Sequence, residues 1–202
     1  MTPATEQTLP MLLKSFHLPT FAREYAVVAA QAVKEGVTHE AYLLALSRQE
    51  ASERAARRVE RLLTDSHLPR EKTPGNFNLN RLPPKARAVF ATLRDGSFLD
   101  KTTNVLLFGN PGTGKTHLVC ALGQELVRNR RTVLFTPTFQ LVQRLLAARR
   151  DLRLSAELKR LDRFEALILD DIGYVQQSRE EMEVLFTLLA ERYERRSVLI
   201  TS

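Results

Sequence analysis

Residues 109–116 read Gly109-Asn110-Pro111-Gly112-Thr113-Gly114-Lys115-Thr116 and match the pattern G-x-x-x-x-G-K-[ST]. An apolar run, NVLLF, precedes the stretch at 104–108, and THLVCALGQELV continues from it with the character of a helix. Glycines suit such a loop because they let phosphate oxygens approach backbone N–H groups and because they tolerate unusual backbone angles. The stretch therefore predicts a phosphate-binding loop between a strand and a helix, as in P-loop NTPases.

The loop predicts ATP and Mg²⁺ as cofactors, and the polar side chains at its end have expected roles. Lys115 supplies an ammonium group to the β- and γ-phosphates, and Thr116 offers its hydroxyl to Mg²⁺. The helix expected at 115–128 directs its first N–H groups and the positive end of its dipole at the anion. His117 follows directly after this stretch, and we count it with the cofactor-binding residues 109–116. Its position is the sole reason, since the sequence shows no base or metal ligand that could act with it.

A second motif, ALILDD at 166–171, places two carboxylates after four apolar residues. This order is typical of a buried strand that leaves the core at its carboxyl end, where ligands bind in open α/β sheets. Asp170 is expected to hold Mg²⁺, directly or through water. Asp171 is expected to orient or deprotonate the attacking water, so it joins Lys115 as a candidate catalytic residue.

Four continuous apolar runs indicate strands that are buried on both faces of a mostly parallel sheet. They lie at 104–108, 132–135, 166–169 and 197–200. Their starts are about 30 residues apart, which is the length of a βαβ unit. Helices are expected between them at 115–128, at 139–149, and from a capping box of Ser178 and Glu181 to about residue 195. The expected fold class is α/β, with a P-loop NTPase core.

The N-terminal third reads as helices, and Thr38 is the expected cap of one that runs to about Leu63. Residues 64–84 hold four prolines and read as a linker. Phe77 and Asn78 are suited either to contact an adenine or to pack the linker. The expected division of the chain is a small all-helical N-terminal domain at 1–69, a linker and lead-in helix at 70–100, and a P-loop ATPase domain at 101–202.

Composition argues against several classes of protein. Hydrophobic residues make up 44% and charged residues 26% of the 202, as in ordinary globular proteins, and no run of 18 uncharged apolar residues occurs. The N-terminus has no signal-peptide pattern, and one cysteine with four scattered histidines gives neither a disulfide framework nor metal-ligand spacing. We therefore expect a cytoplasmic protein without a membrane partner.

The net charge of +7 is concentrated in residues 76–165, which carry 16 Lys and Arg against 7 Asp and Glu. A basic segment attracts polyanions such as nucleic acid, but it is equally consistent with a solvated surface that aids solubility. If DNA binds, neutralising Arg149, Arg150 and Arg153 is expected to weaken binding for all sequences alike.

The motifs together resemble the IstB-like transposition helper ATPases of the AAA+ class, to which the DnaC-type helicase loaders are near relatives. The resemblance rests on GNPGTGKTHL, LILDDIGY and LFTLLAERYERRSVLITS, and on the earlier segments HLPTFAREY and LPREKTPGNFNL. It implies an AAA+ ATPase domain behind a small helical domain. It also implies ATP-dependent self-assembly into a homo-oligomer on double-stranded DNA, and assistance to a transposase of the same insertion sequence.

Two departures from the family pattern bear on activity. Asp171 stands where the family commonly has Glu, which shortens the reach of that carboxylate by about one methylene. The sequence ends at Ser202, where the family continues with a sensor asparagine and a later segment that carries an arginine finger and a helical lid. We therefore expect that the C-terminal part of the AAA+ module is missing, and that the 202-residue chain binds ATP weakly and hydrolyses it poorly.

Three other functions compete with an ATPase that assists transposition. One is a helicase-loader type of AAA+ ATPase in DNA replication, and another is a DNA-binding module that binds ATP without hydrolysing it. The third is a P-loop kinase, which would need an acceptor pocket and a basic lid that the sequence does not reveal.

Overall fold

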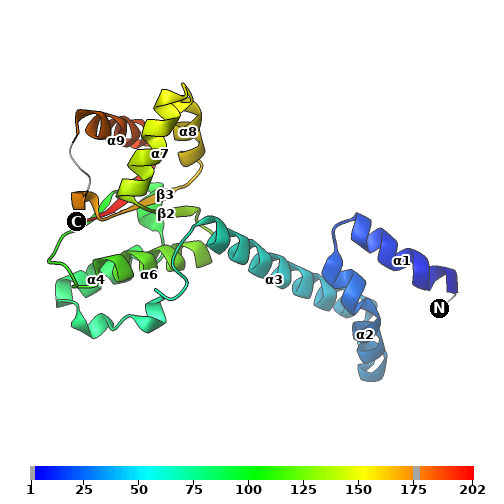
Figure 1. Cartoon of the computed structure of the whole chain (residues 1–202). Coiled ribbons are helices and arrows are strands. Elements are labelled where there is room, and N and C mark those ends of the chain that lie inside the picture. The colour runs from blue at the N-terminus through cyan, green and yellow to red at the C-terminus, as the bar shows by residue number, and fades with distance from the viewer. Residues whose placement is uncertain (1–2, 175–177) are drawn as a thin grey trace. The chain divides into compact units, whose positions relative to one another are not determined.

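A four-stranded parallel sheet organises the residues from Arg61 to Ser202 in the computed structural model, and its order is β1-β4-β3-β2 (Figure 1). The strands are β1 (Val105–Leu107), β2 (Val133–Pro137), β3 (Ala166–Asp170) and β4 (Ser197–Thr201). β3 is buried at all five positions, which explains why its sequence is a continuous apolar run. The predicted α/β fold with a mostly parallel sheet is confirmed.

The structure describes residues 3–174 and 178–202. The α-helices are α1 (Pro3–Ser15), α2 (Pro19–Glu35), α3 (His39–Asp65), α4 (Pro84–Leu93), α5 (Ser97–Asp100), α6 (Lys115–Arg128), α7 (Thr138–Arg150), α8 (Leu154–Leu161) and α9 (Arg179–Arg192). Three 3₁₀ turns lie at Pro74–Asn76, Leu79–Arg81 and Ile172–Tyr174. None of these helices combines the length and the apolar content that crossing a membrane requires.

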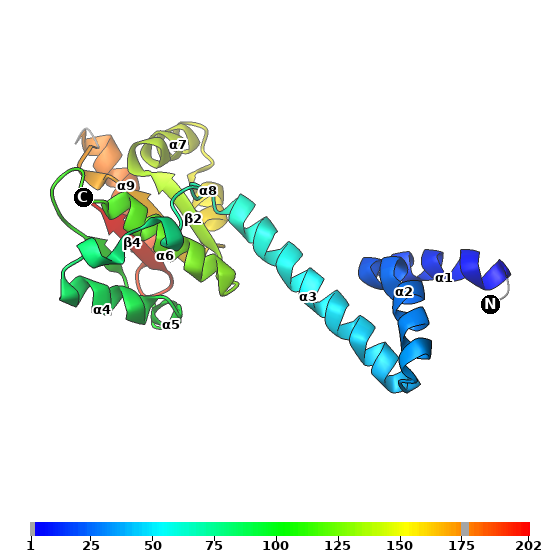
Figure 2. The same ribbon diagram turned by 90° about the horizontal axis from the view of Figure 1, so that it is seen from below.

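Helices cover both faces of the sheet, with α7, α8 and α9 on one side and α4 and α6 on the other (Figures 1 and 2). Side chains alternate along the strands, so Leu134, Leu167 and Val198 join the apolar cluster under α7, α8 and α9. Ile168 and Leu199 are register partners and lie on the α6 side. The carboxyl ends of β2, β3 and β4 therefore meet at one edge of the sheet, close to the start of α6.

Close packing of α6 on the sheet depends on a glycine. A Cβ atom at Gly123 would lie 2.9 Å from Cδ1 of Ile168 and 3.0 Å from Cδ2 of Leu68. Cys120 on the same helix is fully buried, and burial raises the pKa of its thiol to about 12. Helix α6 is thus fixed firmly between the sheet and the segment that follows α3.

The chain divides into two compact units, Met1–Glu60 and Arg61–Ser202. The second unit begins before residue 70 because Ser66 and Leu68 pack on the sheet domain: the Ser66 carbonyl accepts a hydrogen bond from the Phe135 N–H at 2.8 Å. The predicted division into a helical domain at 1–69, a linker and lead-in helix at 70–100 and an ATPase domain at 101–202 stays a prediction.

The first unit is helical, as predicted, and a buried carboxylate joins two of its helices. Glu50 on α3 accepts a hydrogen bond from the N–H of Thr20 at 2.9 Å, at the start of α2, and pairs with Arg54 at 3.2 Å. Burial opposes the charge of Glu50, but the hydrogen bonds from Thr20 and Arg54 prevail and lower its pKa. Thr38 caps α3 through the N–H of Ala41, as the sequence predicts.

Several predicted boundaries differ from the observed ones. The helix after the Ser178–Glu181 capping box forms as expected but ends at Arg192 rather than near 195. The segment 64–84, read as a linker, also contains the end of α3 and two 3₁₀ turns. Helix α8 was not predicted, because eight residues are too few for a clear helical period.

Candidate functional site

The phosphate-loop stretch forms an open turn that leads directly into α6. Gly112 and Gly114 have φ angles of 76° and 89°, in the left-handed region that glycine adopts most readily. The hydroxyl of Thr113 donates to the carbonyl of Asn110 at 2.9 Å and closes the turn. Because α6 begins at Lys115, its first N–H groups lack acceptors within the helix and are available to an anion.

The ammonium group of Lys115 lies at the loop itself. Its Nζ donates to the carbonyl of Gly109 at 2.7 Å and to that of Asn110 at 3.0 Å. These two acceptors hold the positive charge of Lys115 against the backbone of the loop that the sequence predicts for phosphate binding. Pro111 completes the turn at an exposed position.

Asp170, at the carboxyl end of β3, is held by hydroxyl groups from three elements. Thr116 on α6 and Thr201 on β4 donate to its Oδ1 at 2.9 and 2.6 Å, and Thr138 at the start of α7 donates to its carbonyl at 2.8 Å. The Asp170 residue is only 8% exposed. The hydrogen bond between Thr116 and Asp170 brings the phosphate loop and the acidic strand end together.

Asp171 follows in a different environment. It is exposed, its φ is 56°, and its N–H donates to the hydroxyl of Thr201 at 2.9 Å. The turn at Asp171 ends β3 and leads into the 3₁₀ turn Ile172–Tyr174. Two neighbouring carboxylates therefore differ: Asp170 is buried and fixed, whereas Asp171 is open to solvent.

The side chains around Asp170 fit a magnesium ion better than a metal held by protein alone. Among residues 3–174 and 178–202, no three His, Cys, Asp or Glu side chains gather as a ligand set. Mg²⁺ is commonly held by one or two carboxylates together with phosphate oxygens and water. Both hydroxyl hydrogen bonds in the described chain fall on Oδ1 of Asp170, so Oδ2 keeps its capacity to accept.

His117 and Phe77 pack together beside the loop. Their ring centroids are 5.1 Å apart, and Nε2 of His117 lies 3.2 Å from the carbonyl oxygen of Thr73. A Cβ atom at Gly114 would lie 3.1 Å from Cε2 of Phe77. His117 thus contacts the segment before α4, a partner that the sequence did not reveal, and the Phe77 ring favours the linker-packing alternative.

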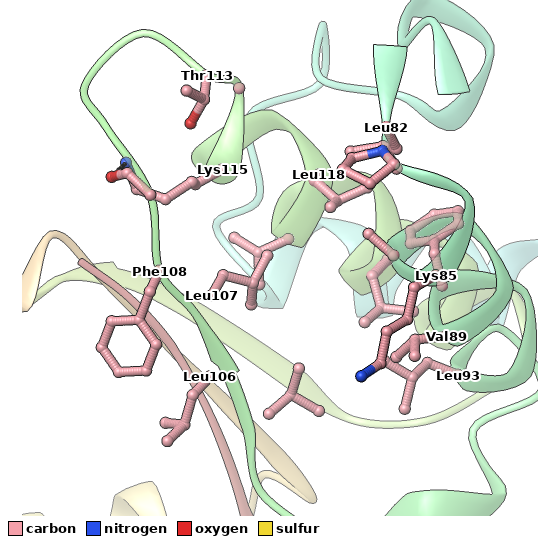
Figure 3. A pocket seen from close by; sticks show the side chains of 18 of the residues that line it. Leu82, Lys85, Val89, Leu93, Leu106, Leu107, Phe108, Thr113, Lys115 and Leu118 are labelled. Carbon is pink, nitrogen blue, oxygen red and sulfur yellow. Dashed lines mark hydrogen bonds between the residues drawn. The ribbon is translucent and has the colours of Figure 1, made fainter. Parts of the chain in front are cut away.

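A cavity of about 700 Å³ adjoins the phosphate loop and is lined mainly by apolar side chains. Figure 3 shows Lys85, Val89 and Leu93 of α4 across the cavity from Leu106 and Leu107 of β1. Sequence reasoning missed these α4 residues because they belong to no motif. The only signal was apolar residues at helical spacing in the expected lead-in helix.

Comparison with known proteins gives one family and several relatives. A family model described as IstB-like ATP binding protein matches residues 11–202. A protein of Sinorhizobium fredii named as an insertion sequence ATP-binding protein is 44% identical over 198 residues, which are 98% of this chain and 66% of that protein. The protein named for insertion sequence IS21 in Pseudomonas aeruginosa is 35% identical over 194 residues, which are 96% of this chain and 73% of that protein. The chain thus spans about two thirds to three quarters of these relatives.

Solved structures share the fold at low sequence identity. The AMPPCP-bound DnaA of Aquifex aeolicus aligns with a TM-score of 0.57 and 20% identity, over 67% of this chain and 43% of DnaA. The DnaC helicase loader aligns with a TM-score of 0.54 and 23% identity, over 62% of this chain and 76% of DnaC. Both likenesses agree with a P-loop NTPase fold.

Proposed function

The chain belongs to the family of IstB-like ATP binding proteins, and we propose that it binds and hydrolyses ATP to assist the transposition of an insertion sequence. The observation that carries this proposal is the hydrogen bond of 2.9 Å between Thr116 and Asp170, which joins the phosphate loop to the acidic end of β3. The family membership agrees with the resemblance expected from the sequence.

Nucleotide binding divides between the loop and the neighbouring cavity. The N–H groups at the start of α6 and the Lys115 ammonium bind the phosphates, because both present positive charge at the loop. The apolar cavity between α4 and β1 accepts the base, since binding sites for small molecules and cofactors are mostly apolar with few polar groups. His117 supports this site by fixing the segment around Thr73 to α6.

Hydrolysis assigns different tasks to the two acidic residues. Thr116 and Asp170 hold Mg²⁺, which when bound neutralises charge on the β- and γ-phosphates. Asp171 orients the attacking water and accepts its proton, a task that suits an exposed carboxylate next to the metal site. Asp170 suits the other task, because a buried carboxylate that accepts hydrogen bonds from hydroxyl groups keeps one orientation toward the metal ion.

The proposed partners are double-stranded DNA, a transposase of the same element and further copies of this chain. The relatives at 44% and 35% identity are named for insertion sequences, which supports a role in transposition. The basic segment 76–165 supports an interaction with DNA. A replication helicase loader is the weaker alternative, because the DnaC likeness at 23% identity concerns the fold alone.

Replacing Lys115 by Ala tests the proposed nucleotide site. We expect Lys115→Ala to weaken binding of a fluorescent ATP analogue at least tenfold, because charge-assisted hydrogen bonds to phosphate are among the stronger polar contacts. Lys101→Ala is the matched control, since it removes the same charge at an exposed position after α5. Binding by the Lys115 variant as tight as by the parent would contradict the proposal.

A further inference from the structure

The hydroxyl of Thr201, at the end of β4, both donates and accepts a hydrogen bond, and its partners are the neighbouring residues Asp170 and Asp171. Its Oγ1 donates to Oδ1 of Asp170 at 2.6 Å and accepts the N–H of Asp171 at 2.9 Å. The residue is fully buried. One side chain therefore contacts the carboxylate of the first acidic residue and the backbone of the second.

This contact follows from the register of two neighbouring strands. Leu169 pairs with Ile200 in the parallel ladder between β3 and β4, so Asp170 and Thr201 are next along the two strands. Parallel strands end at the same edge, which places both residues beside the phosphate loop. The arrangement is built by the sheet and does not depend on a loop conformation.

We propose that Thr201 is a positioning residue that fixes the orientation of the Asp170 carboxylate for Mg²⁺ and stabilises the turn at Asp171. This inference rests on the proposed function, because it concerns the same nucleotide site. The hydroxyl on Oδ1 restrains rotation of the carboxylate, while Oδ2 keeps its capacity for the metal ion or its water. The hydrogen bond to the Asp171 N–H stabilises a backbone with a φ of 56°, which few residues adopt without support.

If Thr201 had a purely structural role, removing its hydroxyl would lower the stability of the fold without changing the Mg²⁺ requirement. Thr138 provides the comparison, since its hydroxyl is equally buried and also donates to Asp170, but to the main-chain carbonyl at 2.8 Å. Removing either hydroxyl costs one or two buried hydrogen bonds and lowers stability. Of these two substitutions, only the one at Thr201 removes a hydrogen bond to the Asp170 carboxylate, which then keeps the hydrogen bond from Thr116.

The test compares Thr201→Val, Thr201→Ser and Thr138→Val in the full chain. A fluorescent ATP analogue is titrated at increasing Mg²⁺ concentrations and again in EDTA. We expect Thr201→Val to raise the Mg²⁺ concentration for half-maximal binding about tenfold, the size of a hydrogen bond to a charged group. Binding in EDTA should stay within about twofold of the parent. Thr201→Ser should restore the parental Mg²⁺ requirement, and Thr138→Val should lower the melting temperature without shifting that requirement.

Three outcomes decide the proposal. An unchanged Mg²⁺ requirement in Thr201→Val, or an equal shift in Thr138→Val, would overturn the positioning role while leaving the proposed function intact. A parent chain that binds no ATP analogue at any Mg²⁺ concentration would overturn the proposed function and this inference with it. Should Thr201→Val not fold, Thr201→Ala removes the same hydroxyl without a branched replacement and carries the same expectations.

Discussion

Asp171 combines an exposed carboxylate with a backbone that few residues tolerate. Its φ of 56° lies in the left-handed region, where Asp and Asn are found more often than other non-glycine residues. Asn therefore keeps both the backbone conformation and the size of the side chain while it removes the charge. This makes the position suitable for separating nucleotide binding from hydrolysis.

Replacing Asp171 by Asn should slow hydrolysis without weakening binding. We expect Asp171→Asn to lower kcat for phosphate release about 100-fold, because the loss of a positioned base commonly costs 10²–10⁴-fold. Affinity for the Mg²⁺ complex of an ATP analogue should change less than about threefold, since Asp170 and Thr116 stay in place. Asp171→Glu is the control, because it keeps the charge. Unchanged turnover in Asp171→Asn would show that another group orients the water.

At the scale of single residues, the sequence predicts the candidate site residues that lie in its nucleotide-binding motifs. It misses the residues that reach the site only through the pairing of strands in the sheet. The loop residues Gly109 to Thr116 and the acidic residue Asp170 follow from spacing and residue type. Thr138 belongs to no motif, and Thr201 lies in the segment LFTLLAERYERRSVLITS, where the resemblance gave it no role of its own. Their contacts with Asp170 became visible only in the folded sheet domain. Apolar runs show that strands exist but do not specify which residues face each other across β3 and β4.

Among the elements, β4, α8 and α9 are joined by a buried arginine. Arg192 is 1% exposed and donates to the carbonyls of Leu161 at 3.0 Å, Phe164 at 2.9 Å and Ser197 at 3.0 Å. Burial lowers the pKa of its guanidinium to about 10. Nε has no acceptor among the described residues, which reduces the net gain from these hydrogen bonds.

Replacing Arg192 by Met should destabilise the second unit. We expect the free energy of unfolding to fall by about 2–4 kcal/mol, because three main-chain carbonyl groups each lose a hydrogen bond from the buried guanidinium although Met fills much of the space. Urea unfolding followed by circular dichroism measures the change. Arg195→Met is the control, since Arg195 forms an exposed pair with Asp162 and should change stability by less than about 1 kcal/mol. Equal effects of the two substitutions would argue against a structural role for Arg192.

The elements that the sequence predicts well are those with the strongest pattern. All four strands are found, and α6 begins at Lys115 and ends at Arg128 as expected. The short helices α5 and α8 give too little periodicity to identify, and packing rather than propensity determines them. Arg192 illustrates the same limit, because a charged residue near a helix end is expected at the surface until the fold encloses it.

At the scale of the whole molecule, the basic segment is partly neutralised by pairs at its surface. Arg149 pairs with Glu183 at 3.0 Å, and Arg153 pairs with Asp151 at 2.6 Å. Arg150 forms no ion pair within the described parts of the chain. Exposed pairs contribute only about 0–1 kcal/mol, so a phosphate backbone can compete for these arginines. The end of α7 and the start of α8 are therefore the best place to test DNA binding.

DNA binding should depend steeply on salt and on the arginines between α7 and α8. We expect the affinity of the chain for duplex DNA, measured with ATP by fluorescence anisotropy, to fall as salt rises from 50 to 200 mM, because binding releases counterions. Arg150→Gln with Arg153→Gln should weaken binding for all sequences alike and reduce the slope of log affinity against log salt by about 2. Arg48→Gln with Arg58→Gln removes equal charge from the first unit and should have a smaller effect. No binding at 50 mM salt, or equal losses in both double variants, would contradict this assignment, because the interaction would then be absent or would follow net charge alone.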